Sequence, residues 1–305
     1  MLDENGKLRN FEARIESTTF CNADCIICVR RKFTRPLQTM CYGHFVSLVD
    51  QFQRLGGKAV SLFGLGEPLC DKGLPEKIQY CADLGLETHI TTNGALLTTN
   101  RARKLLNAGL KNIRFSIHAC TPVYYEKVHR GLDWLITWRN FANFLHLNKK
   151  LGHPCTVHLS VIPLNHERVE DIRKTWERYV DFMEVWSPHN WGGARHFRTV
   201  IPKKNTCGRP FNGPLQVQAD GKVIPCCFLT NGEVILGDTY ESTLKDILQG
   251  GPYQALREAH LTGNLVGYPC ENCDQRNVDM GSILLYSSRD PERKTGVTSS
   301  CKLPV

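Results

Sequence analysis

The sequence predicts an α/β fold in which six β/α units are followed by a smaller α+β region. Two observations lead to this expectation. Short β-rich runs alternate with amphipathic helical patterns through the first two-thirds of the 305 residues, and Gly and Pro become frequent after Trp191. Six units in a row favour a parallel barrel or a doubly wound sheet. In either fold the active site lies at the carboxyl ends of the strands.

The elements of the first region follow from local patterns of apolar residues. The helix expected at residues 99–108 has Thr98 as its N-cap and Gly109 as its C-terminal stop. The other helices are expected at residues 42–55, 74–84, 122–148 and 167–179, and Gly131 can interrupt the long one. Strands are expected at residues 14–19, 58–63, 87–92, 112–118, 155–162 and 182–186.

The pattern changes near residue 198, where we expect the first domain to end. The segment 215–225 alternates around Asp220-Gly221, which is typical of a β-hairpin, and residues 243–260 predict a helix. The tail from residue 282 is polar and is expected to be loose. The predicted organisation is a domain at residues 1–198, a smaller one at 199–281 and a tail at 282–305.

The charge balance is mildly basic, with 38 Lys and Arg against 30 Asp and Glu. This excess favours an anionic substrate or an acidic partner. The basic runs are too short to indicate a nucleic-acid-binding surface. No stretch reaches the ~18 apolar residues that span a bilayer, and the polar start carries no secretory signal. We therefore expect a cytoplasmic protein with no membrane or nucleic-acid partner.

The 14 cysteines are the main anomaly of the composition. In a reducing compartment they indicate metal ligands rather than disulfides. Cys21, Cys25 and Cys28 form a CxxxCxxC pattern just after the first expected strand. Three thiolates in so short a loop can hold three irons of a cubane cluster and leave the fourth iron free to bind another molecule. A zinc site is the alternative, with His44 as the nearest fourth ligand.

This pattern resembles the cysteine loop of the radical S-adenosylmethionine (SAM) superfamily. The resemblance implies a partial (β/α)6 TIM-like barrel, a [4Fe–4S] cluster on the three cysteines, and SAM bound to the open iron. It further implies that one electron cleaves SAM to a 5′-deoxyadenosyl radical, and that a partner such as flavodoxin or ferredoxin supplies this electron. Family members usually carry an aromatic residue before the last cysteine, where this chain has Ile27.

The turn after the second expected strand resembles the GGEP motif of the same family. It reads Gly64-Leu65-Gly66-Glu67-Pro68, so Leu65 interrupts the glycine pair. The resemblance implies that this turn contacts the amino group of SAM, since glycine lets backbone carbonyls come close. A plain turn between a strand and a helix is the alternative.

Other positions resemble further SAM contacts of the family. The resemblance implies that Asn93 and Ser116, at the ends of the third and fourth expected strands, contact the ribose or carboxylate of SAM. It implies that Arg130 pairs with the carboxylate and that Val161 and Pro163 flank the adenine. A helix-surface arginine and ordinary core residues are the alternatives at these last positions.

A second set of cysteines lies in the C-terminal region and comprises Cys207, Cys226, Cys270 and Cys273. Four thiolates make a closed site for a cluster or for zinc. The hairpin that places Gly221 five residues before Cys226 resembles the start of a SPASM or twitch domain. The resemblance implies the shorter twitch form, with one auxiliary [4Fe–4S] cluster on these four cysteines. Such a cluster either accepts an electron from a substrate radical or is purely structural.

Three further cysteines are candidates to donate a hydrogen atom to a substrate radical, because S–H bonds are weak. Cys120 follows the fourth expected strand, Cys227 adjoins a predicted ligand, and Cys301 lies in the tail. An inert thiol is the alternative at each position.

The segment after the sixth expected strand faces the same end of the barrel and contains His189, Asn190 and Trp191. Asn190 and Trp191 are candidates to bind substrate, and a connecting turn is the alternative. Oxidation of an alcohol needs a base that takes the hydroxyl proton. The candidates for this base are His189, His118 and Arg198.

Three hypotheses of function follow. The first is an oxidoreductase or epimerase that abstracts a hydrogen atom from a small molecule such as a sugar or aminocyclitol, and then oxidises or inverts that carbon; twitch enzymes of this kind look similar in size and cysteine layout. The second is a maturase of a ribosomal peptide or protein, although only 20 residues precede Cys21, too few for a fused leader-binding domain. The third is a non-catalytic iron–sulfur or zinc protein.

Overall fold

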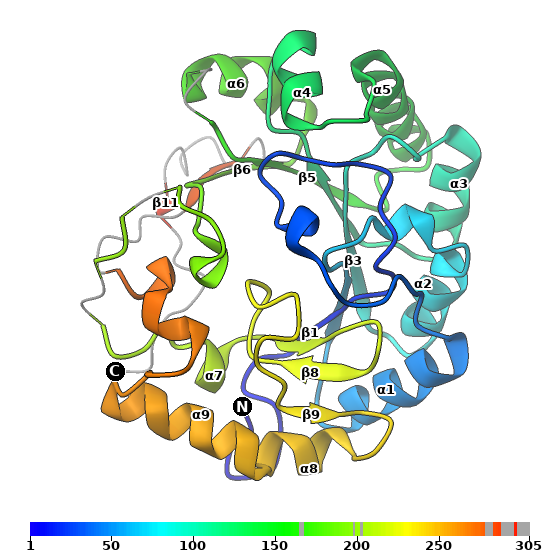
Figure 1. Cartoon of the computed structure of the whole chain (residues 1–305). Coiled ribbons are helices and arrows are strands. Elements are labelled where there is room, and N and C mark those ends of the chain that lie inside the picture. The colour runs from blue at the N-terminus through cyan, green and yellow to red at the C-terminus, as the bar shows by residue number, and fades with distance from the viewer. Residues whose placement is uncertain (165–167, 198, 202–203, 278–282, 288–295, 298–305) are drawn as a thin grey trace.

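Six parallel strands form the centre of the molecule. The computed structural model describes residues 1–164, 168–197, 199–201, 204–277, 283–287 and 296–297 (Figure 1). The central strands are β1 (Glu12–Ile15), β2 (Ala59–Leu62), β3 (Glu87–Thr92), β4 (Asn112–Ser116), β5 (Thr156–Val161) and β6 (Phe182–Trp186). They pair in sequence order, and every pairing is parallel. The predicted strands agree within two residues, except that β1 ends at Ile15, so residues 16–19 belong to a loop.

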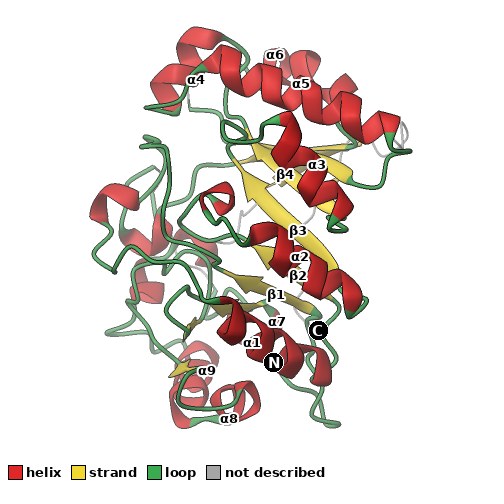
Figure 2. Cartoon of the chain, turned by 90° about the vertical axis from the view of Figure 1, so that its right-hand side faces the viewer, coloured by secondary structure: helices red, strands yellow, loops and turns green. Residues whose placement is uncertain are grey.

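Helices cover one face of this curved sheet (Figure 2). They are α1 (Tyr42–Arg54), α2 (Leu74–Asp83), α3 (Thr99–Asn107), α4 (Pro122–Val128), α5 (Trp134–Lys150) and α6 (Val169–Trp176). Since the helices lie on a single face, the sheet is not doubly wound. Among the described residues β1 and β6 do not pair with each other, so the barrel stays open. The predicted partial (β/α)6 barrel is confirmed.

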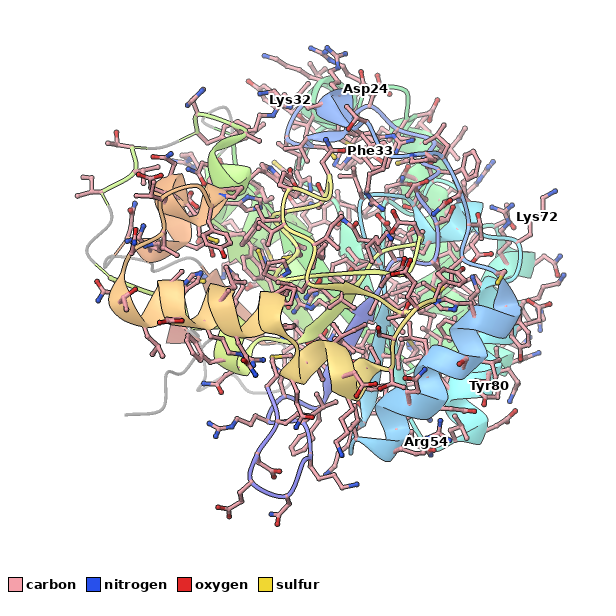
Figure 3. The ribbon with its side chains drawn as sticks, turned by 60° about the horizontal axis from the view of Figure 1, so that its bottom comes forward. Asp24, Lys32, Phe33, Arg54, Lys72 and Tyr80 are labelled. Atoms are coloured by element: carbon pink, nitrogen blue, oxygen red, sulfur yellow. The ribbon has the colours of Figure 1, made fainter. Side chains whose placement is uncertain are left out.

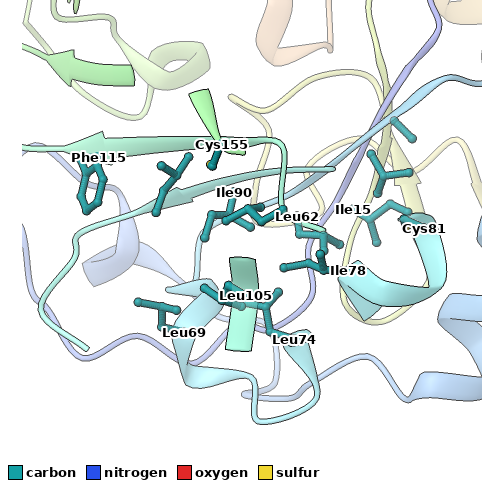
Figure 4. Close-up of a cluster of buried hydrophobic side chains, with 14 of the residues drawn as sticks. Ile15, Leu62, Leu69, Leu74, Ile78, Cys81, Ile90, Leu105, Phe115 and Cys155 are labelled. Carbon is teal, nitrogen blue, oxygen red and sulfur yellow. The ribbon is translucent and has the colours of Figure 1, made fainter. Parts of the chain in front are cut away.

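The hydrophobic core lies between these helices and the sheet (Figure 4). Successive side chains of a strand point to opposite faces. Ile15, Leu62, Ile90 and Phe115 therefore point outward and are at most 1% exposed. The residues that alternate with them along each strand point to the inner face, which is left free for polar side chains and a binding site.

The C-terminal region continues the same sheet instead of forming a separate layer. Strand β7 (Leu215–Val217) pairs parallel with β1, and the predicted hairpin is present as the antiparallel pair of β7 and β8 (Lys222–Ile224). Strand β9 (Gly237–Asp238) follows β8. The helix predicted at 243–260 is divided at Gly250, where the backbone is extended. The helices here are α7 (Arg209–Asn212), α8 (Leu244–Gln249) and α9 (Gly251–Thr262).

Two short segments of the tail also join the sheet. Strand β10 (Ile283–Ser287) pairs antiparallel with β6, and β11 (Gly296–Val297) pairs with β10. The edge of a parallel sheet leaves N–H and C=O groups without partners, and an added strand satisfies them. The short 3₁₀ helices are η1 (Arg30–Lys32), η2 (Pro68–Cys70), η3 (Glu177–Tyr179), η4 (Trp191–Gly193), η5 (Pro269–Asn272) and η6 (Asp274–Arg276).

A buried ion pair joins α2 to the segment just before it, and its lysine also bonds to the segment before α1. Lys77 Nζ lies 2.7 Å from Asp71 Oδ2 and donates to the Met40 carbonyl at 2.7 Å. Both charged side chains are at most 3% exposed. Removing one partner of such a pair leaves a buried charge without compensation, which typically costs about 3–5 kcal/mol.

The substitution Lys77→Met should therefore lower the free energy of unfolding by about 3–5 kcal/mol. Adding Asp71→Asn should recover part of this loss, because the remaining buried carboxylate is then neutral. Urea unfolding of the anaerobic, cluster-loaded protein, followed by circular dichroism, measures both effects. A single variant with the wild-type midpoint would contradict this account of the pair.

Candidate active site

A cavity of about 530 Å³ opens at the carboxyl ends of the parallel strands. Its volume lies in the range of small-molecule sites, about 300–1,000 Å³. The cavity brings together residues that the sequence places far apart. The predicted site residues among its lining are Cys21, Cys25, Cys28, Gly64, Gly66, Glu67, Asn93, Ser116, His189 and Cys227.

The loop with the first three cysteines is held in place by its backbone. The N–H groups of Asp24 and Ile26 donate to the carbonyls of Arg130 and Val128, each at 2.9 Å. The outer side of the loop is charged, and Arg31 pairs with Asp24. Figure 3 shows Asp24 together with Lys32 and Phe33 at one end of the molecule. The inner side, by contrast, presents its sulfur atoms to the cavity.

These three thiols fit an iron–sulfur cluster better than a single metal ion. Burial raises the pKa of Cys21, Cys25 and Cys28. Since thiolates are the form that binds metal, this set ionises only when positive charge is bound among them. Within the described residues, no three His, Cys, Asp or Glu side chains lie close enough together to hold one metal ion. In a cluster each thiolate has its own iron and needs no such convergence.

The glycine turn after β2 is fixed by Glu67, which is 3% exposed. Its carboxylate accepts hydrogen bonds from Leu69 N–H at 3.1 Å, Thr92 Oγ1 at 2.6 Å and Asn93 N–H at 2.8 Å. Burial raises the pKa of Glu67 to about 7, although these bonds favour the charged form. A Cβ on Gly66 would lie 2.1 Å from the Thr18 carbonyl oxygen, so only glycine fits.

Of the other expected SAM contacts, Asn93 and Ser116 line the cavity, whereas Pro68 does not. Asn93 donates to Asn22 Oδ1 at 2.9 Å and so joins the end of β3 to the cysteine loop. Ser116 lies at the end of β4 and lines the cavity. Pro68 follows Glu67 but starts η2 and is buried away from the cavity lining.

Two predicted contacts, Val161 and Arg130, lie outside the cavity lining. Val161 is fully buried in the core, while Ser160 and Ile162 line the cavity, since neighbouring strand residues face opposite sides. Pro163 is outside the lining as well. Arg130 is exposed, and its carbonyl accepts a hydrogen bond from the N–H of Asp24 in the cysteine loop.

The four C-terminal cysteines surround a second, smaller cavity. Cys207, Cys226, Cys270 and Cys273 all line it, together with His260. Burial raises the pKa of Cys270 to about 12 and that of Cys273 to about 11, so these thiols also need bound positive charge to ionise. This structure thus brings together the set that the sequence predicts for the auxiliary cluster.

The two cavities share a wall. Arg209 and Phe228 line both of them, and Cys227 faces the larger cavity although its neighbour Cys226 faces the smaller one. Arg14 Nη1 lies 3.8 Å from the Cys227 sulfur. A molecule in the larger cavity is therefore separated from the auxiliary site by a single layer of side chains.

A short loop around η4 connects the two cysteine sets. Trp191 Nε1 donates to the Ile27 carbonyl at 3.1 Å, and Arg195 Nη2 donates to the Cys28 carbonyl at 2.6 Å. On its other side Asn190 Nδ2 donates to the Asn272 carbonyl at 2.7 Å. Asn190 is 2% exposed and links this loop to the segment between Cys270 and Cys273.

The candidate bases and hydrogen donors divide between cavity and core. His189 lines the cavity and packs against Phe228, with ring centroids 4.3 Å apart. His118 also lines the cavity, and burial lowers its pKa to about 4. Cys120 packs against the hydrophobic core and is outside the lining. Arg198 and Cys301 lie outside the described residues.

The inner face of the sheet adds a polar floor that the sequence analysis missed. Arg114 Nη2 donates to Glu184 Oε1 at 2.7 Å, and Trp186 Nε1 donates to Glu184 Oε2 at 3.0 Å. Burial alone would raise the pKa of Glu184, but the charges of Arg114 and His158 lower it to about 2. The alternation of charged and apolar residues within β4 and β6 is the signal that would have placed Arg114 and Glu184 on this face.

Comparison with known families decides the assignment. Residues 15–183 match the Radical SAM superfamily, and residues 207–274 match SPASM, an iron–sulfur cluster-binding domain. The chain belongs to the radical SAM superfamily. As a radical SAM enzyme with a SPASM domain it has a SAM-binding [4Fe–4S] cluster and an auxiliary cluster. This assignment argues against the third hypothesis, a non-catalytic iron–sulfur or zinc protein.

Curated relatives span several activities. A cofactor-modifying protein for tungsten-containing aldehyde ferredoxin oxidoreductase from Pyrococcus furiosus is 23% identical over 86% of this chain and 87% of its own length. A GTP 3′,8-cyclase of Pelotomaculum thermopropionicum is 25% identical over 60% of this chain. The chain spans 58% of that cyclase and 55% of an uncharacterized Methanocaldococcus jannaschii protein that is 28% identical.

Solved radical SAM structures share the fold. BtrN in complex with AdoMet and 2-DOIA has a TM-score of 0.63 at 20% identity, covering 88% of this chain and 94% of BtrN. Streptococcus suis SuiB bound to the precursor peptide SuiA has a TM-score of 0.68 at 13% identity, covering 90% of this chain and 71% of SuiB.

Among the described residues, no helix is both long and apolar enough to cross a membrane.

The polar floor of this radical SAM enzyme should give a pH-dependent response to Arg114→Leu. In the wild type the lowered pKa of Glu184 keeps its stabilising effect present above about pH 4.5, the ordinary value, and that effect is lost only as pH falls toward about 2. Without Arg114, burial raises the pKa of Glu184, so the variant loses stability as pH rises. The deficit at about pH 8 should be about 2 kcal/mol, because Arg114 is one-third exposed.

Urea midpoints of wild type and variant at about pH 5.5 and pH 8 measure this difference. The double variant Arg114→Leu/Glu184→Gln is the matched control and should show a deficit that does not depend on pH. Equal deficits of the single variant at both pH values would show that the pair does not act through the charge of Glu184.

Proposed function

We propose that this radical SAM enzyme oxidises an alcohol carbon of a small polar molecule, such as a sugar or aminocyclitol, in the larger cavity. The observation that carries the proposal is the shared wall. A substrate in the larger cavity borders Arg209 and Phe228, which also line the auxiliary site. An electron released by the substrate therefore has an acceptor site one side chain away.

The cysteines divide into an open and a closed set. Cys21, Cys25 and Cys28 would hold the SAM-binding cluster, whose fourth iron has no ligand from this loop. The second set, which comprises Cys207, Cys226, Cys270 and Cys273, would hold the auxiliary cluster with every iron ligated. When bound, the first cluster with SAM supplies a hydrogen-abstracting radical, and the auxiliary cluster supplies an electron acceptor.

The polar floor supports a substrate rich in hydroxyl or amino groups. Arg14, Arg114 and Glu184 line the cavity and offer charged donors and acceptors at fixed positions. Trp186 and Trp191 add flat apolar surfaces to the same wall. Pockets of this composition bind small polar molecules and orient them through a few directed hydrogen bonds.

The chain itself handles the proton. His189 lines the cavity beside Phe228 and would accept the proton of the substrate hydroxyl. The substrate then loses a hydrogen atom, an electron and a proton, which together convert an alcohol into a carbonyl. A low-potential flavodoxin or ferredoxin of the cytoplasm would supply the electron that starts each cycle.

Inversion of the same carbon is a second candidate, and the position of Cys227 favours it. Its sulfur faces the larger cavity and lies 3.8 Å from Arg14 Nη1. A thiol there would return a hydrogen atom to the opposite face of the substrate radical, and one electron from the reducing partner together with one proton would convert the resulting thiyl radical back to the thiol. The product would then be an epimer, and no electron would pass to the auxiliary cluster.

Isotope transfer with cysteine variants tests the proposal. Anaerobically reconstituted wild type, given polyols and aminocyclitols deuterated at their alcohol carbons, should yield deuterated 5′-deoxyadenosine and a carbonyl product. Cys28→Ala should abolish SAM cleavage, because the first cluster loses a ligand. Cys270→Ala should retain SAM cleavage but abolish the carbonyl product, because the electron acceptor is lost. The exposed Cys41, outside both cavities, gives Cys41→Ala as the matched control.

The outcomes separate the candidate functions. If the wild type in heavy water forms an epimer that carries one deuterium, and Cys227→Ala does not form it, the reaction is inversion and not oxidation. Deuterium transfer from a peptide, with none from any small molecule, would favour the maturase hypothesis. Carbonyl formation that survives Cys270→Ala would contradict a role of the auxiliary cluster as electron acceptor.

A further inference from the structure

His129 makes a contact with the cysteine loop that the proposed function does not use. Its ring is 1% exposed and lies between Cys25 and the end of β4. Nδ1 lies 3.4 Å from the Cys25 sulfur, and Nε2 lies 3.4 Å from the backbone N–H of His118. The ring also stacks on Tyr125 and on His118, with centroids 4.6 Å and 5.0 Å apart.

These two contacts determine which nitrogen carries the proton. The backbone N–H of His118 can only donate, so Nε2 of His129 accepts and has no hydrogen. The proton of the neutral ring is therefore on Nδ1, which faces the Cys25 sulfur. A sulfur that ligates iron is a thiolate and accepts hydrogen bonds. The ring thus acts as a donor to the sulfur and is oriented for this by a main-chain group.

The bond is not needed to position the loop. Asp24 and Ile26 already bind the carbonyls of Arg130 and Val128 on either side of His129. The side chain adds one contact, and that contact reaches only the sulfur. Hydrogen bonds to ligand sulfurs are among the factors that set the reduction potential of an iron–sulfur cluster, because they stabilise the more negative, reduced state.

We propose that His129 is a positioning residue that donates a hydrogen bond from Nδ1 to the Cys25 sulfur and thereby raises the reduction potential of the SAM-binding cluster. The inference rests on the proposed role of Cys25 as a ligand. Its effect is to ease the first electron transfer from the reducing partner, which SAM cleavage requires. The Nε2 contact with His118 holds the ring in the donating orientation.

Two amide variants separate the two contacts of the ring. His129→Asn places its amide nitrogen where Nδ1 lies, so it keeps the donor to Cys25 and loses the contact with His118. His129→Gln places its amide at the position of Nε2, so it keeps the contact with His118 and loses the donor. Both substitutions are neutral, polar and smaller than histidine, which makes them matched controls for each other.

The measurement is a redox titration of the anaerobic, fully loaded protein followed by electron paramagnetic resonance. Addition of SAM perturbs only the signal of the cluster that binds it, which identifies that signal. At a fixed potential His129→Gln should lower the ratio of reduced to oxidised cluster about tenfold, or ~59 mV for one electron. His129→Asn should stay within about threefold of the wild type, as the retained donor predicts.

Each alternative result overturns the inference. Equal shifts in both variants would assign His129 a packing role, and an unshifted His129→Gln would show that the bond does not act on the cluster. Failure of both variants to retain iron would make His129 a residue of cluster assembly instead. A wild type without a SAM-perturbed signal would refute the ligand assignment itself, and with it the proposed function, independently of His129.

Discussion

The buried carboxylate of Glu16 joins three segments of the chain that build the site. It lies one residue beyond β1 and accepts hydrogen bonds from Leu65 N–H at 2.9 Å, Ala219 N–H at 3.0 Å and Arg35 Nη2 at 2.7 Å. These partners belong to the glycine turn, the C-terminal hairpin and the segment after the cysteine loop. A carboxylate at 4% exposure persists only with such full compensation. Gly64 follows from the same constraint, since its Cβ would lie 2.4 Å from the Glu16 side chain.

The pairing of β7 with β1 places both cysteine sets at one opening. A barrel of six parallel strands that does not close has a free edge at β1, and β7 occupies it in the same direction as β1. The turn of the hairpin that begins with β7 therefore lies at the carboxyl ends of the parallel strands, and β8 runs back along β7. Cys226 and Cys227, two and three residues past β8, face the smaller and the larger cavity respectively. The auxiliary site is thus close to the larger cavity because the hairpin of β7 and β8 lies on the β1 edge of the sheet.

Local sequence patterns predicted the six β/α units and the first cysteine loop, because each depends on residues close together in the chain. The partial barrel and the second cysteine set, which spans residues 207–273, were predicted from the family resemblance. Contacts that depend on direction or on distant partners were missed. The side chain of Val161, predicted to contact SAM, points to the core, and its neighbours Ser160 and Ile162 line the cavity instead. Glu16 reads as a polar residue at a strand end until its partner 203 residues away is known. His129 reads as a helix-end residue, because its sulfur partner lies 104 residues earlier.

The loop of residues 190–195 links the two cysteine sets through hydrogen bonds. Trp191 and Arg195 donate to carbonyls of the loop that contains Cys25 and Cys28, and Asn190 binds the segment between Cys270 and Cys273. The buried Asp274, 0% exposed, accepts the Asn190 N–H at 2.9 Å and fixes this link from the other side. One rigid loop therefore sets the position of both cysteine loops. The same short loop therefore binds main-chain carbonyls next to ligands of both predicted clusters, and it does so without lining the shared wall through Arg195 or Asn190.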